Sequence, residues 1–381
     1  MLKKMKQLIF YINRNTILIG FLMGIVLVYF FLENKKNSET KFEDLALGND
    51  NKTVWSFVEN QRIHCSTLNN LEPCLEGYQN QKENSSVIIW LGNSQLHAIN
   101  QFNPGDKTAA FYLHKLLKNY GFYTLTFSQP NSNLQEHYLL FAHLLNKFPI
   151  KTLILPLVFD DMREDKIRQG IKETLEDKDT IIRIKKTLTG KKLISRYKDK
   201  DIAGNELIKK ETIQDNFEKK INIKFEKIWS VWENRHRLRS ELINKLYQLR
   251  NLIFGITSTT SRKIIRGPYT NNINAFKDIL RLANKKNINI LTYISPIRND
   301  VKIPYDLNEY NDFKKEIKVI SQKFNINLYN FENIVPAQFW GQRKSINHYD
   351  IENIDFMHFK SEGHRLLADA LFLEVNKPPN K

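Results

Sequence analysis

The sequence predicts an α/β protein built on a doubly wound parallel sheet of about five strands. Three observations lead to this prediction. Runs of apolar, β-branched residues recur along the chain, as in "SVIIWLG" (86–92). The runs are nearly continuous and do not alternate with polar residues, which is typical of strands buried on both faces. Amphipathic helical patterns separate them, so helices are expected to cover both faces of the sheet.

The expected strands and helices alternate in chain order. The strands are 86–92, 122–128, 151–159 and 287–295, with a weaker fifth at 326–331. Apolar residues recur at helical spacing in 109–121, 134–148, 272–287 and 363–375. The first of these helices is expected to stop at Gly121, because a glycine commonly follows the end of a helix.

A membrane anchor is expected near the N-terminus. Residues 16–32, "TILIGFLMGIVLVYFFL", contain no charge, and as a helix they span about 26 Å, close to the thickness of a hydrocarbon core. A signal peptide is the alternative, but no small-residue cleavage site follows. The cations before the span favour a cytoplasmic segment at 1–15, a tether at 33–53 and an extracytoplasmic body at 54–381. The expected location is therefore the cytoplasmic (inner) membrane, with a single span.

The two cysteines of the chain, Cys65 and Cys74, both fall in the expected extracytoplasmic body. In an oxidising compartment they would form a small disulfide loop, and two free thiols are the alternative. No further ligands follow at metal-binding spacing, and no Gly-rich phosphate loop is present. We therefore expect no metal and no cofactor.

The chain carries a formal net charge of +17. A basic surface suits nucleic acid, but no nucleic-acid-binding signature accompanies it, so nucleic acid is not an expected partner. Many of the charges fall in residues 162–266, which show no strand pattern and include helical spacing. We expect a helical insertion there, between the third and fourth strands. It would serve as a lid or packing subdomain, or alternatively would grip an anionic polymer or a membrane partner.

Ser94 directly follows the first expected strand, in "LGNSQ" (91–95). Ligands of open parallel sheets bind at the carboxyl ends of the strands, so Ser94 lies where a nucleophile would be useful. A nucleophilic serine needs a base, and "DFMH" supplies Asp355 and His358 in the expected loop before the last helix, with Ser361 as a possible cap of that helix. This spacing lets the acid contact one imidazole nitrogen and leaves the other free for Ser94. The alternatives are a helix N-cap for Ser94 and a surface loop for His358.

Two other histidines are weaker candidates for the base. His97 lies three residues after Ser94 on the same expected helix, and that spacing does not usually allow an in-line approach to the serine oxygen. We expect His97 to be structural or to face the substrate. His364 lies in the closing helix and is expected to be packed or exposed. Trp90 and Phe356 are expected to be core residues or pocket walls.

"LGNSQ" and "DFMH" together resemble the SGNH (GDSL-type) hydrolase and acyltransferase superfamily, over about 86–165 and 268–375. The resemblance implies that Ser94 is the nucleophile, that His358 is the general base and that Asp355 orients His358. It also implies that the backbone N–H of Ser94 is one oxyanion donor.

The sequence departs from this family where further oxyanion donors are expected. "FSQPNSN" (127–133) stands where the family has a glycine, and "VFDDMRE" (158–164) stands where it has an asparagine. The two aspartates of the second motif accept hydrogen bonds when ionised, so they would position the neighbouring arginine or bind a sugar hydroxyl. The residues left as oxyanion or substrate candidates are Asn93, Asn131, Asn133, Asp160, Asp161 and Arg163.

These departures, together with the anchor, resemble the membrane-tethered branch of the superfamily, which includes alginate O-acetylation proteins and the D-alanine transfer protein of teichoic acid export. The resemblance implies a membrane-bound O-acyltransferase as a partner and a cell-surface glycan or teichoic-acid-like polymer as the acceptor. The expected function is a serine acyltransferase or esterase acting on O-acyl groups, most simply O-acetyl. The alternatives are a stand-alone carbohydrate O-acetylesterase and a catalytically inactive, glycan-binding scaffold of an export complex.

Overall fold

The computed structural model describes residues 50–66, 71–81, 85–205, 260–343 and 353–377, together with the isolated Gly24. The chain divides into two compact units, Met1–Phe42 with Leu207–Arg250, and Glu43–Glu206 with Asn251–Lys381. Every element described below belongs to the second unit. The expected anchor at 16–32 lies outside the described residues apart from Gly24, as does most of the tether. Within the described parts of the chain, no helix is both long enough and apolar enough to cross a bilayer.

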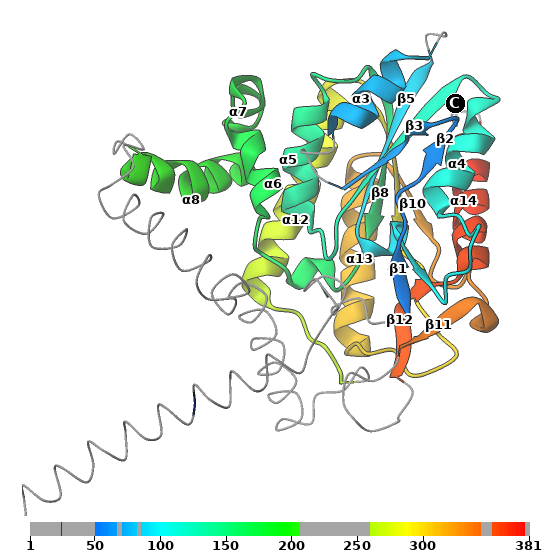
Figure 1. The fold of residues 1–381 in the computed structure, drawn as a ribbon. Helices are drawn as coiled ribbons and strands as arrows, with labels where there is room; N and C mark the ends of the chain where they lie inside the picture. The colour runs from blue at the N-terminus through cyan, green and yellow to red at the C-terminus, as the bar shows by residue number, and fades with distance from the viewer. Residues whose placement is uncertain are drawn as a thin grey trace, which may run out of the picture. The chain divides into compact units, whose positions relative to one another are not determined.

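A parallel sheet of six strands forms the centre of the unit (Figure 1). In spatial order its strands are β10 (Asn327–Asn330), β9 (Asn289–Ile294), β8 (Ile150–Leu157), β5 (Ser86–Gly92), β7 (Phe122–Ser128) and β4 (His64–Cys65). Five of the six were predicted, and their ends lie within two residues of the expected positions. The prediction of about five strands missed β4, a two-residue edge strand that pairs with β7.

The order of the strands places β5 in the interior of the sheet, so its carboxyl end lies between the carboxyl ends of β8 and β7. From β5 the chain crosses to β7 on one side, with Gly92 opposite Ser128. It then returns to β8 on the other side, where Trp90 lies opposite Ile154. A reversal of this kind opens a crevice at the carboxyl ends of the strands, because the two crossover connections leave in opposite directions. Ser94 lies two residues after the end of β5 and is therefore at this crevice.

Helices cover both faces of the sheet (Figure 1). One face is covered by α4 (Ala109–Lys118) and α14 (Ser361–Val375), which pack against each other. The other is covered by α3 (Leu71–Gln79), α5 (Leu134–Leu144), α12 (Arg266–Lys285) and α13 (Leu307–Lys323). The expected helices correspond to α4, α5, α12 and α14, whereas α3 and α13 were not predicted. The layered α/β architecture predicted from the apolar pattern is confirmed.

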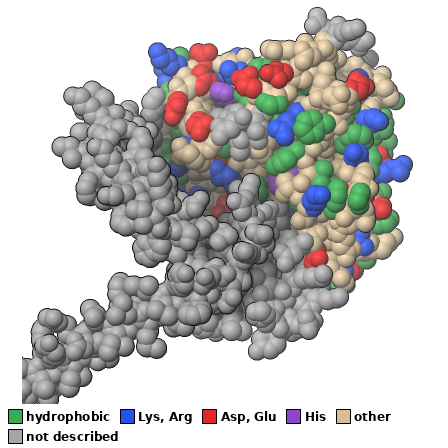
Figure 2. Space-filling view, viewed as in Figure 1, with side chains coloured by type: hydrophobic (Ala, Val, Ile, Leu, Met, Phe, Trp, Pro, Cys, Tyr) green, Lys and Arg blue, Asp and Glu red, His purple; other side chains and the backbone are tan. Residues whose placement is uncertain are grey.

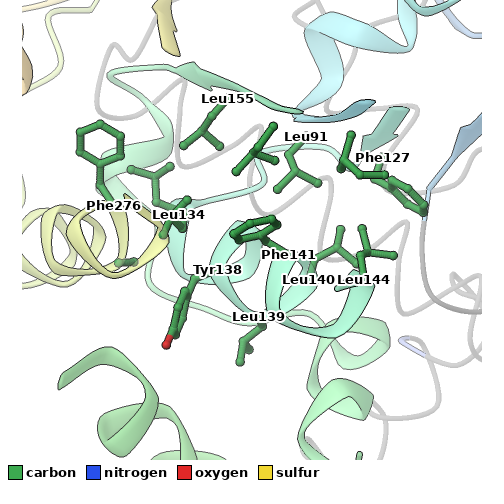
Figure 3. Close-up of a cluster of buried hydrophobic side chains, with 14 of the residues drawn as sticks. Leu91, Phe127, Leu134, Tyr138, Leu139, Leu140, Phe141, Leu144, Leu155 and Phe276 are labelled. Atoms are coloured by element: carbon green, nitrogen blue, oxygen red, sulfur yellow. The ribbon is translucent and has the colours of Figure 1, made fainter. Parts of the chain in front are cut away.

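The larger core lies between the sheet and α5 (Figure 3). Leu91, Phe127 and Leu155 of the sheet contact this layer, into which Phe141 of α5 and Phe276 of α12 project. All five side chains are buried, and complete burial of such a side chain stabilises the fold by about 1.5–3 kcal/mol. The strands that carry the site are therefore held rigidly.

In the part of the chain that the structure describes, three two-stranded ribbons lie outside the main sheet. They pair β1 (Asn51–Thr53) with β6 (Ala98–Asn100), β2 (Phe57–Val58) with β3 (Gln61–Arg62), and β11 (Trp340–Arg343) with β12 (Asn353–Phe359), all antiparallel. The last ribbon corrects a prediction, because Asp355 and His358 lie on a strand and not in a loop. Ser361 is also not the cap of α14. It is the first residue of the helix, and its Oγ hydrogen-bonds with the backbone of Lys107.

The described parts of the expected insertion are 162–205 and 260–266, and the first of these parts is largely helical. It contains most of the 3₁₀ helix η3 (Asp161–Arg163), then α6 (Gln169–Lys172), η4 (Glu173–Leu175), α7 (Lys178–Ile184) and α8 (Leu188–Asn205). The helical spacing that the sequence of this insertion shows, at 224–254, lies outside the described residues. On the face shown in Figure 2, cations and anions are interspersed over the described surface, without a continuous basic field.

Candidate active site

Ser94 is the first residue of the 3₁₀ helix η2 (Ser94–Leu96), two residues after the end of β5. Asn93 caps this short helix, since its side-chain oxygen accepts a hydrogen bond of 3.0 Å from the backbone N–H of Gln95. As the first residue of a helical turn, Ser94 has a backbone N–H without an acceptor inside that turn. The turn therefore holds both the hydroxyl and one N–H donor at the crevice.

Ser94, His358 and Asp355 form one continuous chain of hydrogen bonds. The His358 Nε2 lies 2.9 Å from the Ser94 Oγ, and the His358 Nδ1 lies 3.0 Å from the Asp355 Oδ2. The serine and the histidine are 264 residues apart in the sequence. The structure thus brings together the three residues that the sequence singled out.

The carboxylate of Asp355 is buried and held from several directions. Its Oδ1 accepts hydrogen bonds from the backbone N–H groups of Met357 and His358. Its Oδ2 accepts from the side-chain amides of Asn51 at 2.9 Å and Asn100 at 3.2 Å. Burial alone would raise the pKa of Asp355, but the attraction and hydrogen bond of His358, with the amide and backbone donors, hold it well below its usual value. An ionised Asp355 fixes the proton of His358 on Nδ1 and leaves Nε2 free to accept.

Gln95 links the nucleophile to the segment that carries the base. Its side-chain amide donates hydrogen bonds of 2.9 Å to the carbonyl oxygens of Pro296 and Met357. Gln95 is buried, so these bonds are shielded from water. The bonds explain how β12 is held over the end of β5 although it does not belong to the main sheet.

The two asparagines proposed as oxyanion donors in the 127–133 segment are placed elsewhere. The side chain of Asn133 caps α5, where its oxygen accepts from Gln135 and Glu136, and its nitrogen donates to the Lys166 carbonyl. The Asn133 amide is therefore held at the start of α5 and donates toward Lys166. Asn131 is exposed in the turn before α5, with a φ of 50°. Neither side chain hydrogen-bonds with Ser94 or His358.

The two neighbouring aspartates at the end of β8 have different environments. Asp160 accepts hydrogen bonds from Arg163 at 3.3 Å, from Tyr305 at 3.1 Å, and also from Arg262. The expected pairing of an aspartate with Arg163 is therefore made by Asp160. Asp161 is buried and accepts from the Asn93 amide at 2.7 Å. Asn93 is thus committed to Asp161 and to the η2 cap.

A buried cluster behind Ser94 was not predicted. The Ser128 Oγ lies 2.7 Å from the His64 Nε2 and 2.7 Å from the His97 Nδ1, and Trp55 packs against both imidazoles. Burial lowers the pKa of His64 to about 3 and that of His97 well below its usual value, so both are neutral. His97 was expected either to be structural or to face the substrate, and its burial and its bond to Ser128 show that it is structural. No spacing in the sequence indicates this cluster, because its members come from four separate elements.

The remaining histidine and aromatic candidates are part of the core. His364 is buried, where its Nδ1 accepts from the Ala109 N–H and its Nε2 lies 3.1 Å from the Ala98 carbonyl. Trp90 is fully buried and donates to the Tyr293 hydroxyl, and Phe356 is also buried. No group of His, Cys, Asp or Glu side chains among the described residues is arranged to hold a metal ion.

This arrangement can activate a hydroxyl group for attack on an acyl carbon. A neutral imidazole within hydrogen-bond reach removes the proton of the serine, and the buried carboxylate stabilises the imidazolium that forms. The Ser94 N–H can then donate to the oxygen on which negative charge develops. Acyl transfer is the chemistry for which each of these groups has a use.

Comparisons with known proteins give only distant similarities. No protein-family model matches the chain, and no curated protein matches it. Similar solved structures include a protein described as an acylhydrolase from Bacteroides fragilis, with 8% identity, a TM-score of 0.36, and coverage of 81% of this chain and 97% of that one. A protein described as a GDSL-like lipase from Parabacteroides merdae has 11% identity and a TM-score of 0.36, covering 77% and 97%. A variant of an acetyl-xylooligosaccharide esterase from Geobacillus has 10% identity and a TM-score of 0.35, covering 78% and 98%. At such values we infer function from the geometry of the site alone.

Proposed function

We propose that the protein is a serine-dependent acyl-transfer enzyme that acts on O-acyl esters. One observation carries the proposal: the continuous hydrogen-bonded chain from the Ser94 Oγ through His358 to the buried Asp355. A serine that served only as a helix cap would not require an imidazole at 2.9 Å or a carboxylate behind it. The catalytic roles of the three residues are part of this proposal.

The first half-reaction acylates Ser94. The Oγ attacks the acyl carbon while His358 Nε2 takes its proton, and the C=O electrons move onto the carbonyl oxygen beside the Ser94 N–H. When the C=O bond reforms, the C–O bond to the leaving alcohol breaks, and His358 returns the proton to that alcohol. Asp355 remains ionised throughout and stabilises the imidazolium.

The second half-reaction decides between a transferase and an esterase. A glycan hydroxyl or a water molecule, deprotonated by His358, attacks the acyl carbon. The bond from that carbon to the Ser94 Oγ then breaks, and His358 returns the proton to the Oγ. We propose a cell-surface glycan or a related polymer as the acceptor and a membrane-bound O-acyltransferase as the acyl source. An anchor at 16–32 would hold the enzyme beside that source. The disulfide between Cys65 and Cys74 supports an oxidising, extracytoplasmic location for the body, since such bonds persist there.

The test is a steady-state and stopped-flow assay of the full-length protein with p-nitrophenyl acetate. We expect turnover or a burst of p-nitrophenol in the wild type, none in Ser94→Ala, and a mass increase of one acetyl group on the Ser94 peptide. Traces that do not differ between the two proteins would favour the inactive scaffold. Adding a polysaccharide acceptor then separates the alternatives, because a transferase yields acetylated glycan and an esterase yields acetate.

A further inference from the structure

The buried carboxyl group of Asp161 is hydrogen-bonded to the residue that precedes the nucleophile, but it has no role in the two half-reactions. Asp161 opens η3 at the end of β8, the strand adjacent to β5. Its Oδ2 accepts a hydrogen bond of 2.7 Å from the Asn93 amide, and Asn93 directly precedes Ser94. The carboxyl group is therefore fixed at the same sheet edge as the serine hydroxyl, one side chain away from it.

The orientation of Asn93 determines which oxygen of Asp161 is used. The Asn93 oxygen accepts from the Gln95 N–H, so the nitrogen must face Asp161. This bond is made to Oδ2. Among the described residues, the other oxygen of Asp161, Oδ1, has no hydrogen-bond partner. The backbone around it is also held, because the Asp161 carbonyl accepts from Asn272 of α12 and from the Glu164 N–H.

No cationic side chain within the described ranges forms an ion pair or a hydrogen bond with Asp161. The guanidinium groups of Arg163 and Arg262 lie nearby, but both donate hydrogen bonds to Asp160. The Tyr305 hydroxyl also donates to Asp160. Arg168 is also close enough to attract Asp161, but its own hydrogen bonds go to Glu136 and the Pro130 carbonyl. Among the described residues, the side chain that donates to Asp161 is therefore the neutral amide of Asn93.

A buried carboxyl group in such surroundings favours its neutral form. Burial raises the pKa of Asp161 well above its usual value, and the negative charges of Asp160 and Glu164 act in the same direction. The Asn93 hydrogen bond and the charge of Arg168 oppose this rise without overcoming it. A carboxylic acid that stays neutral can donate a hydrogen bond to an oxyanion, as an amide or a backbone N–H does.

We propose that Asp161 is a catalytic residue: as a neutral carboxylic acid it donates a hydrogen bond from Oδ1 to the carbonyl oxygen of the acyl group that Ser94 attacks. This inference rests on the proposed function and adds a second donor to the Ser94 N–H. The Oδ2 continues to accept from Asn93, so one side chain both positions the η2 cap and stabilises the developing charge. An ionised Asp161 would repel the same oxygen, so the proposal corrects the expectation that this residue acts only as an acceptor.

The proposal predicts opposite behaviour for two substitutions. In Asp161→Ala the donor is lost, and kcat/KM for p-nitrophenyl acetate is expected to fall about 10²–10³-fold. In Asp161→Asn the side-chain oxygen still accepts from Asn93 and the nitrogen donates at every pH, so kcat/KM is expected to stay within about tenfold of the wild type. Asp312→Asn, at an exposed position of α13, removes one carboxylate outside the site and is the charge-matched control.

The pH profile separates a donor from a merely structural residue. Because the protonated form is the active one, the Ser94-dependent kcat/KM of the wild type should fall about tenfold per pH unit once the pH exceeds the pKa of Asp161. Asp161→Asn should lack this fall, while Asp312→Asn should keep it. Infrared difference spectra at neutral pH should show a carboxylic acid C=O band that Asp161→Asn removes, and this readout does not require activity.

Three results would overturn the proposal. The first is an Asp161→Asn variant that is as inactive as Asp161→Ala or that keeps the alkaline fall. The second is an Asp161→Ala variant that folds and loses less than about threefold in activity. In both cases turnover still depends on Ser94, so the proposed function survives. The third is turnover that does not change in Ser94→Ala, which overturns the proposed function and this inference together.

Discussion

Replacing Asp355 by asparagine tests the role of the buried carboxylate with almost no change in shape. In the wild type, Oδ1 faces two backbone N–H groups and Oδ2 faces the His358 Nδ1 and the amides of Asn51 and Asn100. Every one of these neighbours is a donor. An asparagine must direct its own NH₂ group at one of the two sets.

The backbone N–H groups cannot change, but an imidazole can move its proton. The NH₂ group of the variant will therefore face His358, whose Nδ1 must become an acceptor. The proton then lies on Nε2, which donates to the Ser94 Oγ and can no longer accept from it. We expect a loss in kcat/KM of about 10³–10⁴-fold, or about 4–5.5 kcal/mol of transition-state stabilisation. The amide of Asn100 also loses an acceptor, which lowers the free energy of unfolding by about 1–3 kcal/mol.

The assay compares wild type, Asp355→Asn and the exposed control Asp312→Asn by p-nitrophenyl acetate turnover and by urea unfolding. The folded pKa of Asp355 lies below its unfolded value, so its contribution to stability is present above the unfolded pKa and is lost as the pH falls. The acid-induced loss of stability should therefore be smaller in Asp355→Asn than in the control. A folded Asp355→Asn variant with activity within tenfold of the wild type would refute the reasoning about the His358 tautomer.

Three further predictions concern the surroundings of the site. A Cβ at Gly341 would overlap the buried Asn100 side chain, so Gly341→Ala should lower kcat/KM more than tenfold, and an unchanged value would show that Asn100 can move freely. The loop closed by Cys65 and Cys74 predicts that their joint replacement by alanine lowers the free energy of unfolding by about 2.5 kcal/mol, as measured with denaturant against the disulfide-bonded wild type. Because the pKa of His64 is lowered to about 3, the folded state takes up a proton on this imidazole only at a lower pH than the unfolded state does. Stability should therefore decrease as the pH falls from about 6.5 toward 3, and His64→Gln should weaken that dependence in urea titrations at pH 7 and pH 5.

The five main strands could be predicted because burial on both faces leaves a continuous apolar signal. Two of them, β5 and β7, begin and end at the expected residues, because their apolar runs stop at Gly92 and Ser128. The edge strand β4 could not be predicted, because two residues show no periodicity and their position depends on β7 and on the Cys65–Cys74 bond.

The candidate site could be predicted only in part from the sequence. Ser94, Asp355 and His358 could be selected because each stands at a position and spacing with a chemical use. The strand that carries the last two was mistaken for a loop, since Asp355 and His358 interrupt its apolar pattern by facing the site. The bonds from Gln95 to Pro296 and Met357, which hold that strand in place, link residues more than 200 positions apart and leave no local pattern.

The distance along the chain between Ser94 and His358 has a consequence for biosynthesis. The ribosome incorporates the serine first, and 264 further peptide bonds must form before His358 is part of the chain. A growing or prematurely terminated chain can therefore display the hydroxyl group but cannot activate it. Under the proposed mechanism, Ser94 becomes a nucleophile only after β12 has been synthesised and has docked, so a growing chain without β12 would not react with esters.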